Sequence, residues 1–316
     1  MPASHPVVPA GFPAHLCRWQ QLVAPAWVAG LLADTPIAAA PAASWRLLEV
    51  GYGTRDAFLR DHIPQADYLD TTELEQAPVW NKVPDDALLR LLLGHGIRHD
   101  TTVILYSRDA LAAARAAQLM LYAGVGDVRL LDGGYAGWRR LGLPVACGAA
   151  QRCRPAIDFG TDFPARPEYL TDMHGARQLL HQAGGTLVSI RTWKEFIGAT
   201  SGYSYIPACG GIAGARWGHA GAGDDVNSMS AFQHPDGTMR AAGGIARRWA
   251  ANSIGPERNT VFYCGTGWRA SLAFFYAWLM AWPNISVYDG GWCEWSRDPD
   301  NPVICRIAAS GDATAD

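Results

Sequence analysis

Short apolar runs alternate along this chain with longer stretches that favour helices. The runs are rich in Val, Ile, Leu, Phe and Tyr, and they occupy residues 47–50, 103–106, 128–131, 187–190, 260–263 and 286–288. Residues 270–281 favour a long helix directly after one of these runs. Strands that alternate with helices predict parallel βαβ units, and therefore an α/β fold in which helices cover the faces of a sheet.

The same order of segments occurs twice. The run that ends at Ser107 resembles the run that ends at Cys264, and the Asp-Gly-Gly turn at Asp132 resembles the turn at Asp289. Both pairs lie 157 positions apart (264 minus 107, and 289 minus 132). The chain is therefore predicted to contain a duplicated domain, with insertions before Cys264 in the second copy.

Length and composition fit two globular domains. The 316 residues are 49% hydrophobic and 17% charged, which is typical of folded proteins with substantial cores. A segment rich in Pro, Gly and Ala lacks a sustained apolar period and marks the boundary. We expect a first domain at 18–146, a linker at 147–167 and a second domain at 168–305.

Charge and hydropathy argue against two classes of partner. The formal net charge is -3, and the Lys and Arg residues are scattered, so nucleic acid is not an expected partner. The apolar stretch 272–282 has 11 residues, fewer than the ~20 that cross a bilayer, so we expect no membrane span. Pro2, Pro6 and Pro9 interrupt the N-terminus, which has no basic segment, so we expect no signal peptide.

The cysteine pattern indicates reduced thiols. The seven cysteines are residues 17, 147, 153, 209, 264, 293 and 305. They form an odd set without a CxxC or an HExxH motif, so neither a disulfide framework nor a zinc site is predicted. A cytoplasmic location is the simplest interpretation.

The segment Cys264-Gly-Thr-Gly-Trp-Arg269 joins a predicted strand to a predicted helix. Unpaired N–H groups and the positive end of the helix dipole favour an anion at a helix N-terminus, and thiolate is the reactive form of cysteine. Gly265 and Gly267 allow the backbone to aim several N–H groups at the sulfur. The planar guanidinium of Arg269 suits an oxyanion such as thiosulfate. Cys264 is therefore the predicted nucleophile.

These residues resemble the rhodanese family, and the CGTGWR loop resembles the active loop of some of its members. Further similar motifs are residues 188–191, 195–196, 211–215 and 288–292. The resemblance covers residues 20–305 and implies two tandem rhodanese-like domains, each a mainly parallel sheet flanked by helices. It further implies that the second domain is catalytic and the first is not, since Ser107 stands at the cysteine position and a hydroxyl carries sulfur poorly.

The resemblance implies a ping-pong sulfur transfer. Cys264 would attack the outer sulfur of a small donor such as thiosulfate, hold the sulfur as a persulfide, and pass it to cyanide or a thiol. No cofactor or metal is implied, and a sulfur-carrier protein is an alternative partner. Seven residues besides Cys264 are candidates for substrate binding: Gly265, Thr266, Gly267, Trp268, Arg269, Arg191 and Arg216.

Two more residues are considered near this site. His219 is a candidate for the donor pocket, and Cys209 lies in an insertion, 200–211, that we expect to border it. A strand-end salt bridge is an alternative role for Arg191, and a solvated surface position is an alternative for Arg216 and His219.

Departures from the family pattern and other protein classes leave alternatives open. Ser189 stands where the family usually has Asp, and Glu195 where many members have a substrate-binding Arg, which disfavours 3-mercaptopyruvate as donor. A 3-mercaptopyruvate sulfurtransferase and a persulfide relay for a protein partner would both need the same loop.

A cysteine phosphatase uses Cys-x5-Arg, whereas this chain has Cys-x4-Arg, which leaves less room for phosphate. A purely structural protein would require an unreactive Cys264.

Overall fold

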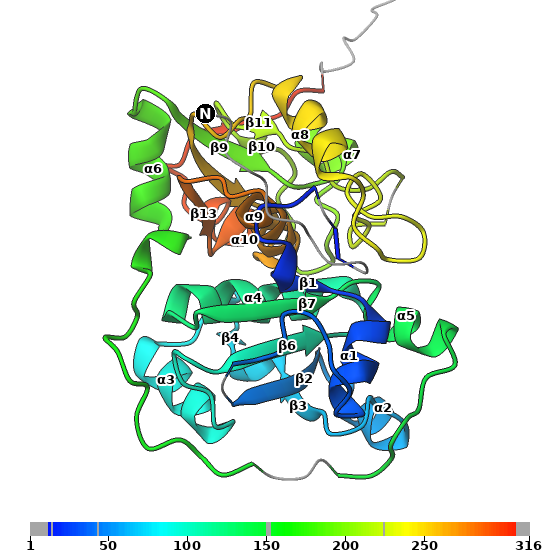
Figure 1. Ribbon diagram of the computed structural model, residues 1–316. Helices are drawn as coiled ribbons and strands as arrows, with labels where there is room; N and C mark the ends of the chain where they lie inside the picture. Colours follow the sequence, from blue (N-terminus) through cyan, green and yellow to red (C-terminus); the bar gives the residue numbers. More distant parts are fainter. Residues whose placement is uncertain (1–11, 14, 43, 150–152, 224, 308–316) are drawn as a thin grey trace, which may run out of the picture.

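The computed structural model describes residues 12–13, 15–42, 44–149, 153–223 and 225–307. The chain forms two α/β domains, one above the other in Figure 1, where the first is coloured blue to green and the second green to red. The N-terminal segment on which the signal-peptide expectation rests, and linker residues 150–152, lie outside the described residues.

The first domain contains a five-stranded sheet in the order β1-β7-β6-β2-β3, with all neighbours parallel. Its strands are β1 (Leu22–Val23), β2 (Trp45–Gly51), β3 (Asp67–Asp70), β6 (Thr102–Tyr106) and β7 (Asp127–Leu131). Its helices are α1 (Pro25–Leu32), α2 (Arg55–Arg60), α3 (Asp85–Gly94), α4 (Ala110–Ala123) and α5 (Gly134–Arg140). A small hairpin joins β4 (Glu75–Gln76) to β5 (Asn81–Lys82).

The second domain repeats this plan with the order β11-β9-β12-β13-β8, again with all neighbours parallel. Its strands are β8 (Leu170–Thr171), β9 (Gly185–Ser189), β11 (Arg216–Trp217), β12 (Asn259–Tyr263) and β13 (Ile285–Tyr288). Its helices are α6 (Met173–His181), α7 (Trp193–Ile197), α8 (Ala242–Ala250), α9 (Trp268–Leu279) and α10 (Gly291–Trp295). Strands β10 (Gly211–Ile212) and β14 (Val303–Ile304) pair beside it, and three short 3-10 helices lie at Trp19–Gln21, Thr71–Glu73 and Pro167–Tyr169.

These sheets confirm the predicted duplicated α/β fold. The apolar runs expected to be strands become β2, β6, β7, β9, β12 and β13, each within two residues of the expected bounds. Central β6 and β12 hold equivalent places and end directly before Ser107 and Cys264. The described part of 147–167 contains no helix or strand before Pro167, and the domain bounds themselves stay a prediction.

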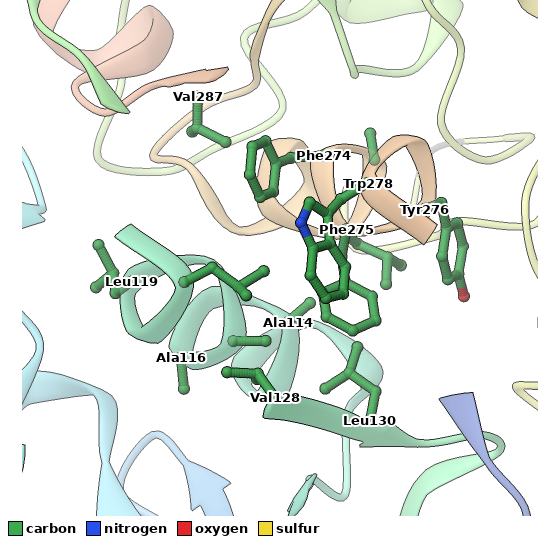
Figure 2. Close-up of a cluster of buried hydrophobic side chains, with 14 of the residues drawn as sticks. Ala114, Ala116, Leu119, Val128, Leu130, Phe274, Phe275, Tyr276, Trp278 and Val287 are labelled. Atoms are coloured by element: carbon green, nitrogen blue, oxygen red, sulfur yellow. The ribbon is translucent and has the colours of Figure 1, made fainter. Parts of the chain in front are cut away.

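Helices α4 and α9 form the centre of the contact between the domains, as Figure 2 shows. The small side chain of Ala114 on α4 leaves room for Phe275 and Trp278 on α9, and all three residues are buried. A helix that is apolar on every side requires cover on every side. The two helices supply part of that cover to each other, so one apolar cluster runs through both domains.

The apolar stretch 272–282 lies mostly within α9, and 11 of the 12 residues of this helix are buried. Within the described part of the chain, no helix has the length and hydropathy needed to span a membrane.

Candidate active site

The central strand β12 carries Cys264 to the carboxyl edge of the second sheet, directly before α9. The helix begins at Trp268 after Gly267, which has a φ of 102° and provides no side-chain cap. The backbone N–H of Gly267 donates a hydrogen bond to Cys264 Sγ at 3.2 Å. Sulfur therefore takes the place of a capping oxygen at the N-terminus of a 12-residue helix, where the dipole favours a negative charge.

The second Asp-Gly-Gly turn holds this loop from behind. The N–H groups of Trp292 and Cys293 donate to the carbonyl oxygens of Cys264 and Gly265, at 2.8 and 2.9 Å. Gly291 has a φ of 53°, and a Cβ there would lie 2.7 Å from both carbonyl oxygens. Only glycine fits this approach without a shift of the backbone, so the turn fixes the position of Cys264.

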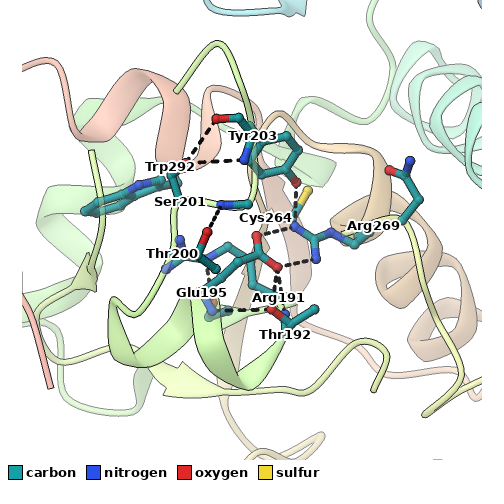
Figure 3. Close-up of polar contacts among 12 residues, drawn as sticks. Arg191, Thr192, Glu195, Thr200, Ser201, Tyr203, Cys264, Arg269 and Trp292 are labelled. Carbon is teal, nitrogen blue, oxygen red and sulfur yellow. Dashed lines mark hydrogen bonds and ion pairs between the residues drawn. The ribbon is translucent and has the colours of Figure 1, made fainter. Parts of the chain in front are cut away.

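Arg269 forms a bidentate ion pair with Glu195 beneath the loop, as Figure 3 shows. Nη1 and Nη2 each donate to a different carboxylate oxygen at 2.8 Å, and Nη2 also donates to the hydroxyl of Tyr203. Burial alone would raise the pKa of Glu195, but the ion pair outweighs it and the pKa lies below its ordinary value. The positive charge of Arg269 is therefore compensated within the scaffold, whereas the sequence predicted that it faces an oxyanion.

Above Cys264 lies a cavity of about 230 Å³ between the two domains. Its described lining residues are Tyr52, Glu75, Trp80, Leu111, Tyr203, Tyr205, Asn227, Cys264, Thr266, Trp268 and Arg269. The rings of Tyr52 and Trp80 form one edge-to-face pair, with centroids 6.1 Å apart, and those of Tyr203 and Tyr205 form a second pair 5.4 Å apart. The volume lies just below the ~300–1,000 Å³ of drug-sized ligand sites, so the cavity suits a small molecule.

The first domain contributes a buried carboxylate to this cavity. Glu75 accepts hydrogen bonds from the indole N–H of Trp268 and from Nε of Arg115, and Arg115 also binds Asp289. Burial raises the pKa of Glu75 to about 7, although Arg115 and Trp268 oppose this shift. The network ties the first domain both to the active loop and to the turn behind it.

The structure brings most of the candidate loop residues together. Cys264, Thr266, Trp268 and Arg269 line the cavity. Gly265 lies so close to the ring of Tyr203 that a Cβ would overlap it, and Gly267 donates to the sulfur. Trp268 also contacts the first domain through Glu75.

Arg191 and Arg216 lie outside the cavity, which corrects their predicted place in the donor pocket. Arg191 is fully buried and donates to Ser189 Oγ and to the carbonyl of Gly210. It has a structural position between the rings of Tyr263 and Trp292. The side chain of Arg216 instead reaches the backbone carbonyls of Asn252 and Ser253.

His219 and Cys209 also lie away from the described cavity lining. His219 lines a different surface hollow beside Trp217, and burial lowers its pKa to about 4. Cys209 is exposed, although its insertion, 200–211, does border the cavity through Tyr203 and Tyr205.

Sequence reasoning missed the wall that the first domain contributes. Tyr52, Glu75, Trp80 and Leu111 reach the cavity only because the two domains pack together, and no local motif marks them. Asp132 and Asp289 were interpreted as turn residues. Each also crosses the domain interface: Asp132 accepts from the N–H of Met239, and Asp289 binds Arg115.

The fold and site define a class: a two-domain α/β protein with a cysteine thiol at a helix N-terminus. Residues 27–141 and 172–298 both match the family described as rhodanese-like domain. The chain therefore belongs to the rhodanese-like family, with two domains in tandem.

Individual relatives are similar over most of this chain. The thiosulfate sulfurtransferase YnjE of Escherichia coli is 56% identical, over 91% of this chain and 66% of its own length, so this chain spans about two thirds of that relative. A probable 3-mercaptopyruvate sulfurtransferase of Pseudomonas aeruginosa is 34% identical, over 81% of this chain and 88% of its own. The crystal structure of YnjE has a TM-score of 0.90 with 55% identity, and the match covers 93% of this chain and 70% of that one. A structure of EanB with a cysteine persulfide and ergothioneine has a TM-score of 0.89 with 37% identity, and the match covers 93% and 72%.

Proposed function

We propose that this protein is a sulfurtransferase that moves a sulfane sulfur from a small donor such as thiosulfate to cyanide or a thiol through a persulfide on Cys264. One observation carries the proposal: Cys264 Sγ lies beside the cavity between the domains and accepts a hydrogen bond from the N–H of Gly267, the residue directly before α9. Relatives that are named as sulfurtransferases, and a neighbour that holds a cysteine persulfide, support it.

The reaction divides one transfer into two displacements at sulfur. The Cys264 thiolate attacks the outer sulfur of thiosulfate, the bond between the two donor sulfurs breaks, and sulfite leaves with the electron pair. The acceptor then attacks the terminal sulfur of the persulfide, and Cys264 leaves as thiolate. The N–H of Gly267 already points at the sulfur, so a preorganised donor stabilises the negative charge at each stage.

Cys264, Gly265, Thr266, Gly267, Trp268 and Arg269 are the residues to which we assign this chemistry. Arg269 acts by holding the loop and Tyr203 in place, because Glu195 compensates its charge. Thiosulfate would then rely on backbone N–H groups, and we expect it to bind weakly. The same compensation disfavours 3-mercaptopyruvate, whose carboxylate would need a free cation.

The mechanism requires no cofactor. Among the described residues, no group of three His, Cys, Asp or Glu side chains is placed to hold a metal ion. All seven cysteines are free thiols in the structure, and a reducing compartment such as the cytoplasm would keep them so. A sulfur-carrier protein that takes the place of the small acceptor is the alternative partner.

Intact mass spectrometry tests the proposal. The reduced protein is incubated with thiosulfate, and the excess donor is removed. The intact mass is then measured before and after treatment with cyanide. We expect one added sulfur atom that cyanide removes, in the wild type and in Cys209→Ser, whose thiol is exposed and outside the described cavity lining. Cys264→Ser should gain none.

Loading with different sulfur donors distinguishes a thiosulfate enzyme from the two alternative functions. Loading by 3-mercaptopyruvate or by a cysteine desulfurase, but not by thiosulfate, would favour the mercaptopyruvate enzyme or the protein relay. If none of the three donors loads Cys264, the sulfurtransferase proposal is wrong.

A further inference from the structure

Positive charge at the cavity is already compensated. Arg269 is the one cationic side chain among its described lining residues, and Glu195 binds both of its terminal nitrogens. The pair itself carries no net charge; the buried Arg191 also lowers the pKa of Glu195, but it is not among the described residues that line the cavity. An anionic second substrate would therefore find no free guanidinium or ammonium among the described residues that line the cavity.

Negative charge is compensated less completely. The guanidinium of Arg115 lies between two carboxylates, Glu75 and Asp289, and all three side chains are buried. Of the two carboxylates, Glu75 lines the cavity. Asp289 also accepts from the backbone N–H of Lys82 at 2.8 Å, which adds a hydrogen bond but no charge. When both carboxylates are ionised, this network holds one negative charge in excess beside the cavity.

The remaining wall also favours a cation. Five aromatic side chains are among the described lining residues: Tyr52, Trp80, Tyr203, Tyr205 and Trp268. Aromatic faces carry negative electrostatic potential and attract organic cations within about 6 Å of the ring centre. Tyr52 and Tyr205 are each about half exposed, so their rings can still contact a ligand.

We propose that Glu75 sets the charge specificity of the site and that the sulfur acceptor is a small organic cation that carries a thiol. The inference rests on the proposed sulfur transfer. The thiolate of the acceptor attacks the terminal sulfur of the Cys264 persulfide, and the bond between the two sulfurs breaks. Its electron pair returns to Cys264 as thiolate, and the acceptor leaves as a persulfide, so no oxidant or reductant is consumed.

The pH dependence of the specificity follows from the same geometry. The groups that face Glu75 are Arg115 from α4, Trp268 from α9, Asp289 from the turn after β13, and Tyr205. Burial raises the pKa of Glu75 to about 7, so the carboxylate gains its charge as the pH rises through this value. Preference for a cation should be weak at pH 6 and strong at pH 8.

Two thiols of similar size and opposite charge test the inference. The persulfide-loaded protein is unloaded by cysteamine or by 3-mercaptopropionate at pH 8 and low salt. The cysteamine to mercaptopropionate rate ratio in the wild type is divided by the same ratio in Glu75→Gln, which cancels the intrinsic reactivity of the thiols. We expect this quotient to be about tenfold, as one nearby charge in a partly screened site would give.

Glu168→Gln is the matched control, because Glu168 is an exposed carboxylate outside the described cavity lining. Its rate ratio should equal that of the wild type. Equal ratios in wild type and Glu75→Gln would overturn the inference while leaving the sulfurtransferase proposal intact.

A second measurement needs no persulfide. Cationic and anionic methanethiosulfonate reagents are reacted with the reduced protein, and modification of the peptide that contains Cys264 is timed by mass spectrometry. The measured quantity is the ratio of the reaction rate with the cationic reagent to the rate with the anionic reagent. A higher ratio at pH 8 than at pH 6 supports the charged wall, even if Glu75→Gln fails to fold. A preference that does not change with pH contradicts it, and failure of persulfide loading alone counts only against the proposed function.

Discussion

The loops after β6 and β12 occupy equivalent places in the two domains but treat the following helix differently. In the first domain, the Asp109 carboxylate accepts hydrogen bonds from the N–H groups of Leu111 and Ala112, and so caps α4. In the second, α9 has no side-chain cap, and the N–H of Gly267 donates to Cys264 Sγ. In the same scaffold, backbone N–H groups at the start of the helix can therefore donate hydrogen bonds either to a carboxylate, as in α4, or to a cysteine sulfur, as in α9.

The space in front of the two loops differs as well. The hollow beside Ser107 measures about 30 Å³, against about 230 Å³ above Cys264. The side chain of Arg108 occupies the space beside the first loop, where it pairs with Glu49 and lies over the ring of Tyr135. In the second domain the equivalent residue is Gly265, which has no side chain, and the ring of Tyr203 from the same domain lies against it. The loop of the first domain therefore lacks both a cysteine and an adjacent cavity of substrate size.

The largest expected effect comes from moving the cysteine between the domains. The double variant Ser107→Cys/Cys264→Ser should take up no sulfur from thiosulfate, because Asp109 caps α4 and places a carboxylate near the new thiol. Intact mass spectrometry measures the added sulfur, with the wild type and Cys264→Ser alone as references. Loading of the double variant at the wild-type rate would show that the scaffold alone, without the open glycine loop, is sufficient.

A smaller effect is expected from the buried carboxylate beside each loop. Glu195→Gln should lower the free energy of unfolding by about 3–5 kcal/mol, since it leaves the buried charge of Arg269 without its partner. Glu49→Gln should cost less, because Arg108 is partly exposed and burial already raises the pKa of Glu49. Chemical denaturation of both variants measures the difference. A cost for Glu49→Gln equal to that of Glu195→Gln would contradict this account.

The smallest effect concerns the glycine behind each loop. Gly291→Ala and Gly134→Ala should each cost about 1–3 kcal/mol of stability, because both residues have positive φ and a Cβ would approach a loop carbonyl at 2.7 or 2.8 Å. Only Gly291→Ala should also slow persulfide formation, since it displaces Cys264. Single-turnover loading rates, measured where both variants are fully folded, separate the two effects. Equal slowing in both would mean that Gly291 acts through general stability.

The sequence was sufficient for the fold because each domain is specified by local patterns. Apolar runs such as 260–263 became parallel strands, and the duplicated Asp-Gly-Gly turns marked equivalent points in both sheets. The position of Cys264 at the start of a helix also followed from its neighbours in the chain. What was predicted correctly therefore follows from patterns within short segments of the sequence.

The cavity wall could not be predicted in the same way. Glu75 and Trp80 meet Trp268 and Tyr205 only through packing between the domains, and their chain separations carry no periodic signal. The charge of Arg269 was misjudged for a related reason. Glu195 was noticed as a departure from the family pattern, but a bidentate pair 74 positions apart becomes visible only in three dimensions.

The packing of α4 against α9 also limits how independent the two domains can be. Removal of the first domain would uncover the aromatic face of α9 and open the cavity on one side. The second domain therefore depends on the first for part of its core and for one wall of the cavity above Cys264.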